Sequence, residues 1–292
     1  MGLIEQAAKR LQELRRAGRA VTDKVEPAGL HAIPSRAASE AAPTGHSRAA
    51  RLKLDLAKLA AEGFVTPDMP RSRIADEFRI IKRPLIANAS GKGSTQITHG
   101  NLIAVTSAVP GEGKTFSAVN LAMSIAMEQD RTVLLVDADV ARPSLPRTFA
   151  IAGSPGLLDV LNDKSVDLGQ VLHHTNVEKL TFLSSGSQHA RSTEMLASDA
   201  MTDLLNELAA RYSDRIVVFD SPPLLVTTDA RVLASRMGQI VFIVDAESTA
   251  QSEVKRALTT IEACPIKLMV LNKARTKAQG AYGYGYGYGY GC

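Results

Sequence analysis

Cysteine is nearly absent from this chain of 292 residues, in which only Cys264 and Cys292 occur. Two cysteines so far apart match no metal-ligand spacing and cannot staple a fold, which argues against zinc sites, iron–sulfur clusters and disulfide scaffolds. The chain also has no run of the roughly 18 to 20 apolar residues that a membrane-spanning helix needs. Charges occur throughout the first segment, MGLIEQAAKRLQELRRAGR, unlike a secretory signal peptide. We therefore expect a cytosolic protein.

The composition predicts one main domain with additional tails. Hydrophobic residues make up 45% of the chain, enough for one full-sized core, and the net charge of +4 is mildly basic. Basic residues gather near the N-terminus, at Lys9, Arg10, Arg15, Arg16 and Arg19. They indicate either a solvated helix face or a surface that attracts acidic lipid or an acidic partner.

Four segments are predicted along the chain. Apolar residues at helical spacing predict an amphipathic helix over 1–17, and the Ala, Pro, Gly and Ser-rich stretch 18–50 indicates a disordered linker. A catalytic domain is expected over 51–275 and a tail over 276–292. Within the domain, residues 51–62 alternate at first and then become helical, so their type stays open. The pattern SRIADEFRIIKR predicts a helix over 72–83 that ends before Pro84.

From Asn101 onward, short apolar runs alternate with stretches of helical periodicity. The runs are LIAVTSA, TVLLVDAD, KLTFLSS, RIVVFD, QIVFIVDA and IKLMVLN, and the longest helical stretch is STEMLASDAMTDLLNELAARY. Continuously apolar runs are expected when helices cover both faces of a parallel sheet. In the longest helical stretch, one core-facing stripe is formed by Met201, Leu204, Leu205 and Leu208. The pattern predicts an α/β fold with a doubly wound, mostly parallel sheet, which binds ligands at the carboxyl ends of its strands.

The segment AVPGEGKT, from Ala108 to Thr115, lies between the first apolar run and a helical stretch. This strand, loop and helix context is that of a phosphate-binding P-loop, although the pattern usually begins with glycine where this chain has Ala108. Gly111 and Gly113 let backbone N–H groups approach phosphate oxygens, and Lys114 is suited to neutralise the phosphates. Thr115 offers a hydroxyl to Mg²⁺. The predicted nucleotide-binding residues are Pro110, Gly111, Glu112, Gly113, Lys114, Thr115 and Phe116.

Carboxylates end two of the predicted strands. Asp137 and Asp139 have the same parity in LLVDAD, so both should point toward the phosphates. Asp220 ends VVFD and reads as a Walker B carboxylate that holds Mg²⁺. Asn272 ends the last run, where its amide either binds an adenine edge or simply forms a turn.

The motifs VPGEGKT, LLVDAD and VVFDSPP, in this order over residues 101–275, resemble the bacterial tyrosine kinases of exopolysaccharide and capsule assembly. The segments MGLIEQAAKRL and DEFRIIKRPL look most like the stand-alone members in exosortase-associated (PEP-CTERM) exopolysaccharide loci. The resemblance implies a P-loop NTPase of the partition and septum-site ATPase-like class that phosphorylates tyrosine with ATP and Mg²⁺.

The resemblance also implies roles for individual residues. Catalysis falls to Lys114, Asp137, Asp139 and Asp220. Thr115, Asp139 and Asp220 suit the shell of the metal, which leaves Asp137 as the predicted acceptor of the tyrosine proton. The second motif of the family often has arginine two residues after its second aspartate, where this chain has Ala141 followed by Arg142.

Relatives assemble into rings through a helix that bears Glu, Arg and Arg at three-residue spacing. In this chain the same spacing is occupied by Asp76, Arg79 and Lys82. We therefore expect homo-oligomerisation through this helix.

Five of the six tyrosines lie in the last eleven residues, each followed by glycine, at Tyr282, Tyr284, Tyr286, Tyr288 and Tyr290. Alternating Tyr-Gly offers no apolar set that packs, and glycine raises the entropy cost of ordering, so the pattern predicts a mobile tail. A phosphoacceptor needs such freedom to enter an active site. Beside the three-element nucleotide site, the tail is predicted to be the substrate of the kinase, although a sticky low-complexity tail without chemistry is the alternative.

The resemblance implies several partners. A transmembrane polysaccharide co-polymerase would recruit the chain to the inner face of the plasma membrane and activate it, a phosphotyrosine phosphatase would oppose it, and no nucleic acid is expected. One alternative function is a partition- or septum-site-type ATPase, a nucleotide-dependent dimerisation switch without phosphoryl transfer. Such ATPases carry an early P-loop lysine where this chain has Val109 and Pro110, which counts against that interpretation. Another alternative is a non-catalytic interaction protein with a structural nucleotide.

Overall fold

The computed structural model describes residues 51–93, 96–151, 153–211 and 214–274. The predicted N-terminal helix, the linker and the tyrosine-rich tail lie outside the described residues. Within the described ranges, no helix is both long and apolar enough to cross a bilayer.

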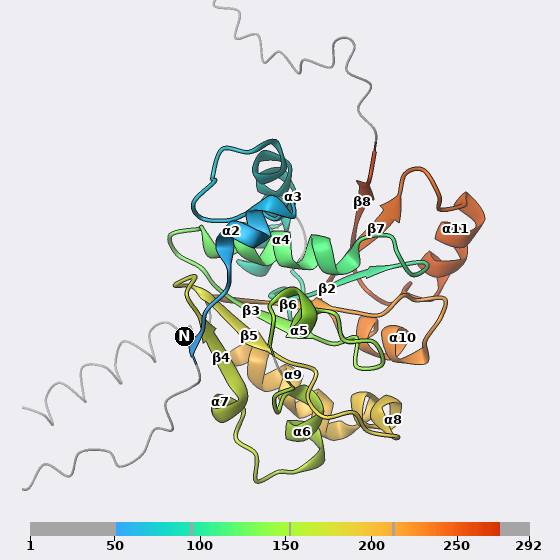
Figure 1. The fold of residues 1–292 in the computed structure, drawn as a ribbon. Helices are drawn as coiled ribbons and strands as arrows, with labels where there is room; N and C mark the ends of the chain where they lie inside the picture. Colours follow the sequence, from blue (N-terminus) through green and yellow to red (C-terminus); the bar gives the residue numbers. More distant parts are fainter. Residues whose placement is uncertain (1–50, 94–95, 152, 212–213, 275–292) are drawn as a thin grey trace, which may run out of the picture. The chain divides into compact units, whose positions relative to one another are not determined.

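The centre of the domain is an eight-stranded sheet with the strand order β1-β4-β5-β3-β6-β2-β7-β8 (Figure 1). All neighbouring strands run parallel except β4 and β5, which are antiparallel. The strands span Arg51–Leu52 (β1), Leu102–Ser107 (β2), Thr132–Asp137 (β3), Leu172–Thr175 (β4), Leu180–Leu183 (β5), Arg215–Asp220 (β6), Gln239–Asp245 (β7) and Ile266–Asn272 (β8). This confirms the predicted α/β class with its mostly parallel sheet.

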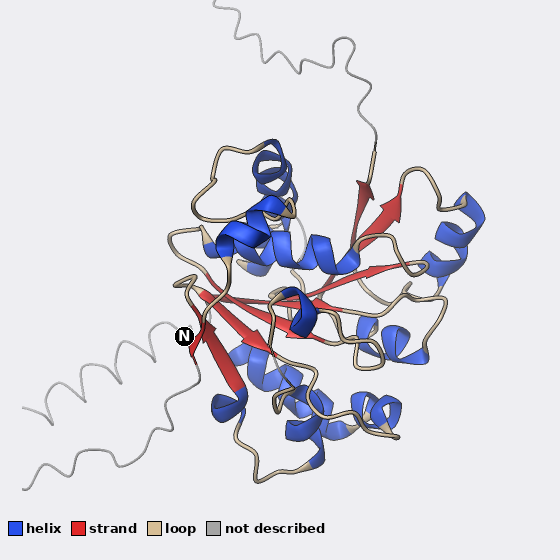
Figure 2. Cartoon of the chain, viewed as in Figure 1, coloured by secondary structure: helices blue, strands red, loops and turns tan. Residues whose placement is uncertain are grey.

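Helices cover both faces of the sheet (Figure 2). They span Leu56–Ala61 (α2), Arg73–Ala89 (α3), Lys114–Ala126 (α4), Leu145–Thr148 (α5), Leu157–Asn162 (α6), Leu168–Val171 (α7), Ser192–Ala197 (α8), Asp199–Ala210 (α9), Thr228–Ala234 (α10) and Gln251–Thr259 (α11). In Figure 1, α2, α3 and α4 lie on one side of the sheet, and α6, α8, α9 and α10 lie on the other. The ambiguous stretch 51–62 contains both a short strand, β1, and a helix, α2.

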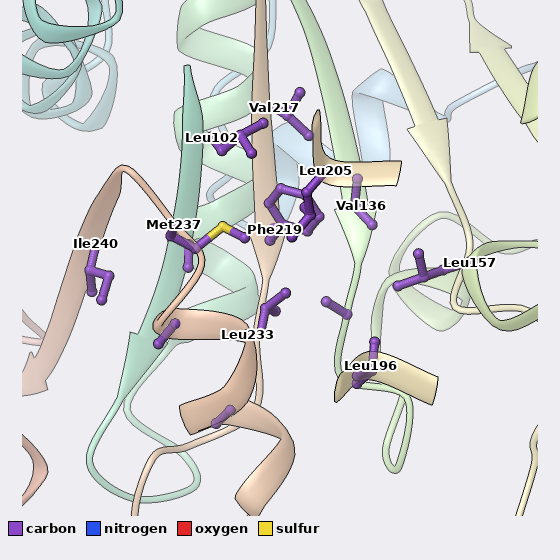
Figure 3. Packing of buried hydrophobic residues seen from close by; sticks show 14 of the residues in the cluster. Leu102, Val136, Leu157, Leu196, Leu205, Val217, Phe219, Leu233, Met237 and Ile240 are labelled. Carbon is purple, nitrogen blue, oxygen red and sulfur yellow. The ribbon is translucent and has the colours of Figure 1, made fainter. Parts of the chain in front are cut away.

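Each face of the sheet has its own hydrophobic core. Side chains of β2, β3 and β6 alternate between the two cores, so Ile103 and Val105 pack toward α4 whereas Leu102 and Ala104 pack toward α9 and α10. Figure 3 shows the core on the side of α9 and α10, in which Phe219 of β6 lies near Leu205 and Met237. All four residues of the predicted stripe on α9 are buried. This two-sided burial explains why the strands read as continuously apolar in sequence.

Helix α3 continues through Pro84 to Ala89, so the predicted end before Pro84 was wrong. Proline removes one backbone donor and normally kinks or ends a helix. Here the proline ring lies on the exposed side, while Phe78 before it and Leu85 after it are both buried in the core shared with α4. Packing on both sides of the proline therefore stabilises the longer helix.

Residues 192–210 form two helices, α8 and α9, where the sequence predicted a single one. Ser198 has an extended conformation at the break, and its side chain accepts a hydrogen bond from the N–H of Met201. A serine that caps the helix after it competes with helix continuation through its own position.

Candidate active site

The predicted phosphate loop connects β2 to α4 at the carboxyl end of the sheet. Gly111 and Gly113 have φ values of 87° and 94°, in the left-handed region that favours glycine. A side chain at Gly113 would also collide with the amide of Asn272, because an added Cβ would lie 2.1 Å from Nδ2. Lys114 begins α4 and is only 9% exposed. The loop thus places backbone N–H groups and the positive end of α4 on the same side as a lysine.

Thr115 joins the loop to the strand-end carboxylates. Its hydroxyl donates to Oδ2 of Asp220 at 2.7 Å, and its Oγ1 lies 2.7 Å from Oγ of Ser144. Asp220 ends β6, which is the neighbour of β2 in the sheet. The predicted pair of metal ligands, Thr115 and Asp220, is therefore in direct contact.

Asp137 and Asp220 are paired across β3 and β6. Both carboxylates are almost fully buried, and the Oδ1 atom of each has no hydrogen-bond partner among the described residues. Burial, with the nearby carboxylates of Asp220 and Asp139, raises the pKa of Asp137 to about 8. Burial also raises the pKa of Asp220 to about 7, against the hydrogen bond from Thr115 and the charge of Lys114. Two buried carboxylates side by side repel each other, so a cation or a proton between them would stabilise both.

Asp139 lies two residues beyond Asp137, just past the end of β3, and is partly buried. Its Oδ1 accepts a hydrogen bond from the backbone N–H of Arg142 at 3.2 Å. Burial raises its pKa, although the Arg142 N–H and the charge of Lys114 act in the opposite direction. All three predicted catalytic aspartates therefore interact electrostatically with one another or with Lys114.

These residues fit a nucleotide with Mg²⁺ on two structural grounds. Asp220, which contacts the hydroxyl of Thr115, and the neighbouring Asp137 each have a buried carboxylate oxygen without a partner among the described residues, and oxygen atoms are the ligands that Mg²⁺ prefers. Gly111 and Gly113 hold the loop in a left-handed conformation that brings successive N–H groups close to an anion.

Glu112 occupies a position that the sequence did not predict in detail. Its carboxylate is 1% exposed and accepts hydrogen bonds from Val109 N at 2.7 Å, Asp245 N at 3.3 Å and the Thr249 hydroxyl. The side chain thus braces the loop against the end of β7.

Sequence reasoning missed two further polar residues of the site. Ser144 precedes α5 and contacts Thr115. Asp229 lies in the first turn of α10, its Oδ1 has no partner among the described residues, and its charge raises the pKa of Asp139. Neither follows an apolar run, so no strand-end signal marks them. The only sequence signal for Asp229 is that it lies in the segment that follows the Walker B strand.

The remaining predicted nucleotide-binding residues lie around the loop. Pro110 is exposed, and the ring of Phe116 packs against Phe64 with centroids 5.1 Å apart. Nδ2 of Asn272 donates to the carbonyl of Glu112 at 2.9 Å. This contact places Asn272 against the phosphate loop and leaves its role toward adenine a prediction.

The predicted oligomerisation residues separate into two environments on α3. Asp76 and Arg79 form an exposed ion pair, and Arg79 also donates to the carbonyl of Pro70 at 2.8 Å. Lys82 is buried instead, and its ammonium contacts Glu128 at 2.7 Å and the carbonyl of Ser124 at 2.5 Å. Because its charge is used inside the subunit, only Asp76 and Arg79 of the three are available to a neighbouring chain. The five predicted phosphoacceptor tyrosines lie outside the described residues.

Comparisons with known proteins show which family the chain belongs to. Residues 100–273 match the family model described as AAA domain. The chain is 34% identical over 183 residues to tyrosine-protein kinase YwqD of Bacillus subtilis, covering 62% of this chain and 76% of that protein. It is 33% identical over 182 residues to tyrosine-protein kinase ptk of Acinetobacter johnsonii, but spans only 24% of its length.

A solved structure shares the fold as well. The kinase domain of Escherichia coli tyrosine kinase ETK aligns with a TM-score of 0.56 and 30% sequence identity, over 64% of this chain and 73% of that domain. The fold described above thus has a counterpart in a solved kinase domain.

Proposed function

Since the chain belongs to the AAA domain family and is a bacterial tyrosine-protein kinase, we propose that it is an autokinase whose substrate is its own C-terminal tyrosine cluster. The observation that carries this proposal is the contact of Thr115 with Asp220 beside Lys114 and Asp137, in a chain whose tyrosines are concentrated in one terminal segment. A nucleotide site alone is common to P-loop proteins and does not identify a phosphate acceptor. The tyrosine segment supplies the proposed phosphate acceptor.

Lys114 and the loop N–H groups would bind and orient the phosphates of ATP, because phosphoryl transfer depends mainly on positioning and charge neutralisation. Thr115, Asp139 and Asp220 would hold Mg²⁺, and Ser144 would fix the Thr115 hydroxyl. A magnesium ion, when bound, supplies positive charge that offsets the charge on the phosphate oxygens.

Asp137 is the proposed proton acceptor. A tyrosine hydroxyl has a pKa near 10, so a base is needed when its oxygen attacks the γ-phosphorus. The new bond joins the tyrosine oxygen to phosphorus, the bond from phosphorus to the β–γ bridging oxygen breaks, and the proton passes to Asp137. Burial, with Asp220 and Asp139 nearby, raises the pKa of Asp137 to about 8, which makes this carboxylate a stronger base than an exposed one.

The position of β8 supports the tail as substrate. Its last residue, Asn272, contacts the phosphate loop, so the described part of the chain ends close to that loop. The 17 residues from Thr276 onward span at most about 55–60 Å. We propose that a tail of this length enters the active site of a neighbouring subunit, so that the transfer occurs in trans.

We further propose that the kinase acts in exopolysaccharide chain synthesis and export, as the resemblance of its motifs implies. In this role a transmembrane co-polymerase would recruit it to the inner face of the plasma membrane and activate it. A phosphotyrosine phosphatase would return it to the unmodified state, and Asp76 with Arg79 would contribute to the ring contact.

The test is to incubate the purified chain with ATP and Mg²⁺, with and without the cytosolic segment of the co-polymerase, and to map phosphotyrosine by mass spectrometry. We expect phosphate on the tyrosines of the tail, none in Lys114→Met and none in a chain truncated after Lys277. Phosphate that persists on the tail of Lys114→Met, or its absence from the wild type under every condition, would reject the proposal.

A further inference from the structure

Two residues at the C-terminal end of β8 donate hydrogen bonds to the phosphate loop. They are Asn272, the last residue of the strand, and Lys273, the residue after it. Nζ of Lys273 donates to the carbonyl of Gly111 at 2.7 Å and to Oδ2 of Asp245 at 2.8 Å. Nδ2 of Asn272 donates to the carbonyl of the next loop residue, Glu112, at 2.9 Å. Two consecutive loop carbonyls are thus bound by the last residue of β8 and by the residue that follows it.

A second set of contacts fixes Asp245, the partner of Lys273. Asp245 ends β7, and its backbone N–H donates to the buried carboxylate of Glu112. The backbone N–H of Ala246 donates to the carbonyl of Asn272 at 2.9 Å. The loop, the end of β7 and the end of β8 therefore form one connected network of hydrogen bonds.

Lys273 adopts an unusual backbone conformation in this network. Its φ is 57°, in the left-handed region that residues other than glycine seldom occupy. Such strain persists where surrounding contacts determine it, and it concentrates at functional sites. The conformation turns the chain at the end of β8 and places the lysine side chain between Gly111 and Asp245.

These contacts bear directly on anion binding. In a phosphate loop the N–H groups must face the anion, so the carbonyls between them must point away and find other partners. Lys273 and Asn272 supply donors to the two carbonyls at Gly111 and Glu112. Without these donors, the same carbonyls would be free to turn toward the phosphate and repel it.

We propose that Asn272, Lys273 and Asp245, here termed the P-loop clamp, set the geometry of the phosphate loop, and that Lys273 is a positioning residue for ATP. The proposal rests on the proposed function, since it assumes that the loop binds ATP. Lys273 lies nine residues before Tyr282, so the clamp also joins the phosphate loop to the segment that carries the acceptors.

The test compares three variants of the full chain: Lys273→Met, Lys273→Arg and Lys267→Met. Lys267 is the matched control, because it lies on β8, near Lys273 in the chain, but donates to the carbonyls of Glu262 and Cys264. The affinity for adenylyl-imidodiphosphate with Mg²⁺ is measured by calorimetry, and kcat and KM for ATP are measured by autophosphorylation. The melting temperature without nucleotide is recorded for each variant.

We expect Lys273→Met to weaken nucleotide binding on the order of tenfold and to raise KM for ATP more than it lowers kcat. Lys273→Arg, whose guanidinium can still donate to both partners, should recover binding to within about threefold of the wild type. Lys267→Met should bind like the wild type, and without nucleotide the melting temperatures of the two Met variants should agree within about 2 °C.

Two results would overturn the clamp while leaving the kinase intact. One is wild-type nucleotide affinity in Lys273→Met, and the other is an arginine variant as weak as the methionine variant. A chain truncated after Lys277 keeps the clamp, so a tenfold loss of affinity there would assign the effect to the tail and also overturn the proposal. If instead the wild type binds no better than Lys114→Met, the proposed function fails and the clamp fails with it.

Discussion

The pairing of Asp137 with Asp220 lowers the stability of the ligand-free protein. Each carboxylate is buried and has an oxygen without a partner among the described residues. Burying a charge without a partner is unfavourable, and burying two side by side adds their repulsion. A protein that keeps such a pair gains a binding site for a cation at the expense of stability when the site is empty.

The pH dependence of stability follows from the same pair. Because the folded state raises the pKa of Asp137 to about 8 and that of Asp220 to about 7, it keeps protons that the unfolded chain has lost. Between pH 5 and 8, without Mg²⁺ or nucleotide, the free energy of unfolding should therefore fall with rising pH, by on the order of 2–4 kcal/mol.

In Asp137→Asn, the slope of the free energy of unfolding against pH, measured by urea unfolding between pH 5 and 8, should be roughly half that of the wild type. This variant should also be more stable than the wild type at pH 8. The exposed Asp68→Asn is the control and should keep the wild-type slope. A wild-type stability that rises between pH 5 and 8 would contradict the assignment of raised pKa values.

Glu112 gives a second prediction at the residue scale. Glu112→Gln preserves the shape of the side chain, but its amide group would place a donor against the N–H groups and the hydroxyl that the carboxylate now accepts from. We expect a loss of about 1–3 kcal/mol in the free energy of unfolding, with weaker ATP binding. Chemical denaturation measures the first effect, and the exposed Glu178→Gln should show neither. Unchanged stability in Glu112→Gln would contradict the bracing role of this carboxylate.

At the scale of elements, α3 is held to the turn after α4 by a buried ion pair. Lys82 contacts Glu128 at 2.7 Å with only 4% of its side chain exposed. Burial lowers the pKa of Lys82, and the hydrogen bond and charge of Glu128 act against this shift. Burying an ion pair gives little net stability, but removing one partner leaves the other charge buried and unpaired.

Glu128→Ala should therefore destabilise the protein by about 2–4 kcal/mol, whereas Lys82→Met should cost less, because methionine fills the same space without a charge. Thermal or urea unfolding of both variants measures the difference. Glu62→Ala, which breaks the exposed pair of Lys58 and Glu62, should cost less than about 1 kcal/mol. A Lys82→Met variant that is less stable than Glu128→Ala would contradict this ranking.

The elements also show what the sequence can predict. Continuous apolar runs identified β2, β3, β6 and β7, because both faces of these strands are buried. An apolar run also identified β8, although its side chains alternate between partly buried and exposed. Periodicity alone did not show that α3 passes Pro84 or that Ser198 divides α8 from α9, since tertiary packing decides the first and a serine cap the second. The short strand β4, which lies between the edge strand β1 and β5, has partly buried or exposed side chains over most of its length and left no apolar run to recognise.

The proximity of the predicted site residues could be read from the sequence where they lie at or beside the end of a buried strand. Lys114, Thr115, Asp137 and Asp220 lie close together as the strand-end rule requires, and their roles remain predictions. Ser144 and Lys273 follow no such rule, and neither does Asp229 in the first turn of α10, because their places depend on long-range contacts that a single sequence does not encode locally. Lys82 was predicted to take part in oligomerisation from its spacing on the helix, and this spacing does not show that Lys82 is buried against Glu128.

At the scale of the whole molecule, charge links the proposed substrate to assembly. Each phosphate adds about −1.5 to −2 charges at pH 7, so five modified tyrosines would add about −8 to −10 to a chain of net charge +4. Repulsion between several such tails would act against an oligomer, which gives a physical cause for a cycle of assembly and release.

This cycle predicts that ATP and Mg²⁺ should shift an oligomeric wild type toward smaller species, while a chain with all five tail tyrosines changed to phenylalanine should stay associated. Sedimentation velocity before and after incubation measures the shift, and higher salt should reduce it because salt screens the repulsion. Dissociation of the phenylalanine variant to the same extent would show that phosphate on the tail is not the cause.

The central claim is that the site around Lys114 phosphorylates the tyrosine tail of another chain, and a mixing experiment tests it most directly. A chain with five Tyr→Phe changes in its tail, which keeps the site, is mixed with Lys114→Met, which keeps the tyrosines, and both are incubated with ATP and Mg²⁺. Mass spectrometry should find phosphotyrosine at positions 282–290 of the Lys114→Met chain in the mixture and none when that chain is incubated alone. An unmodified tail in the mixture, under conditions in which the wild type modifies its own, would contradict the account.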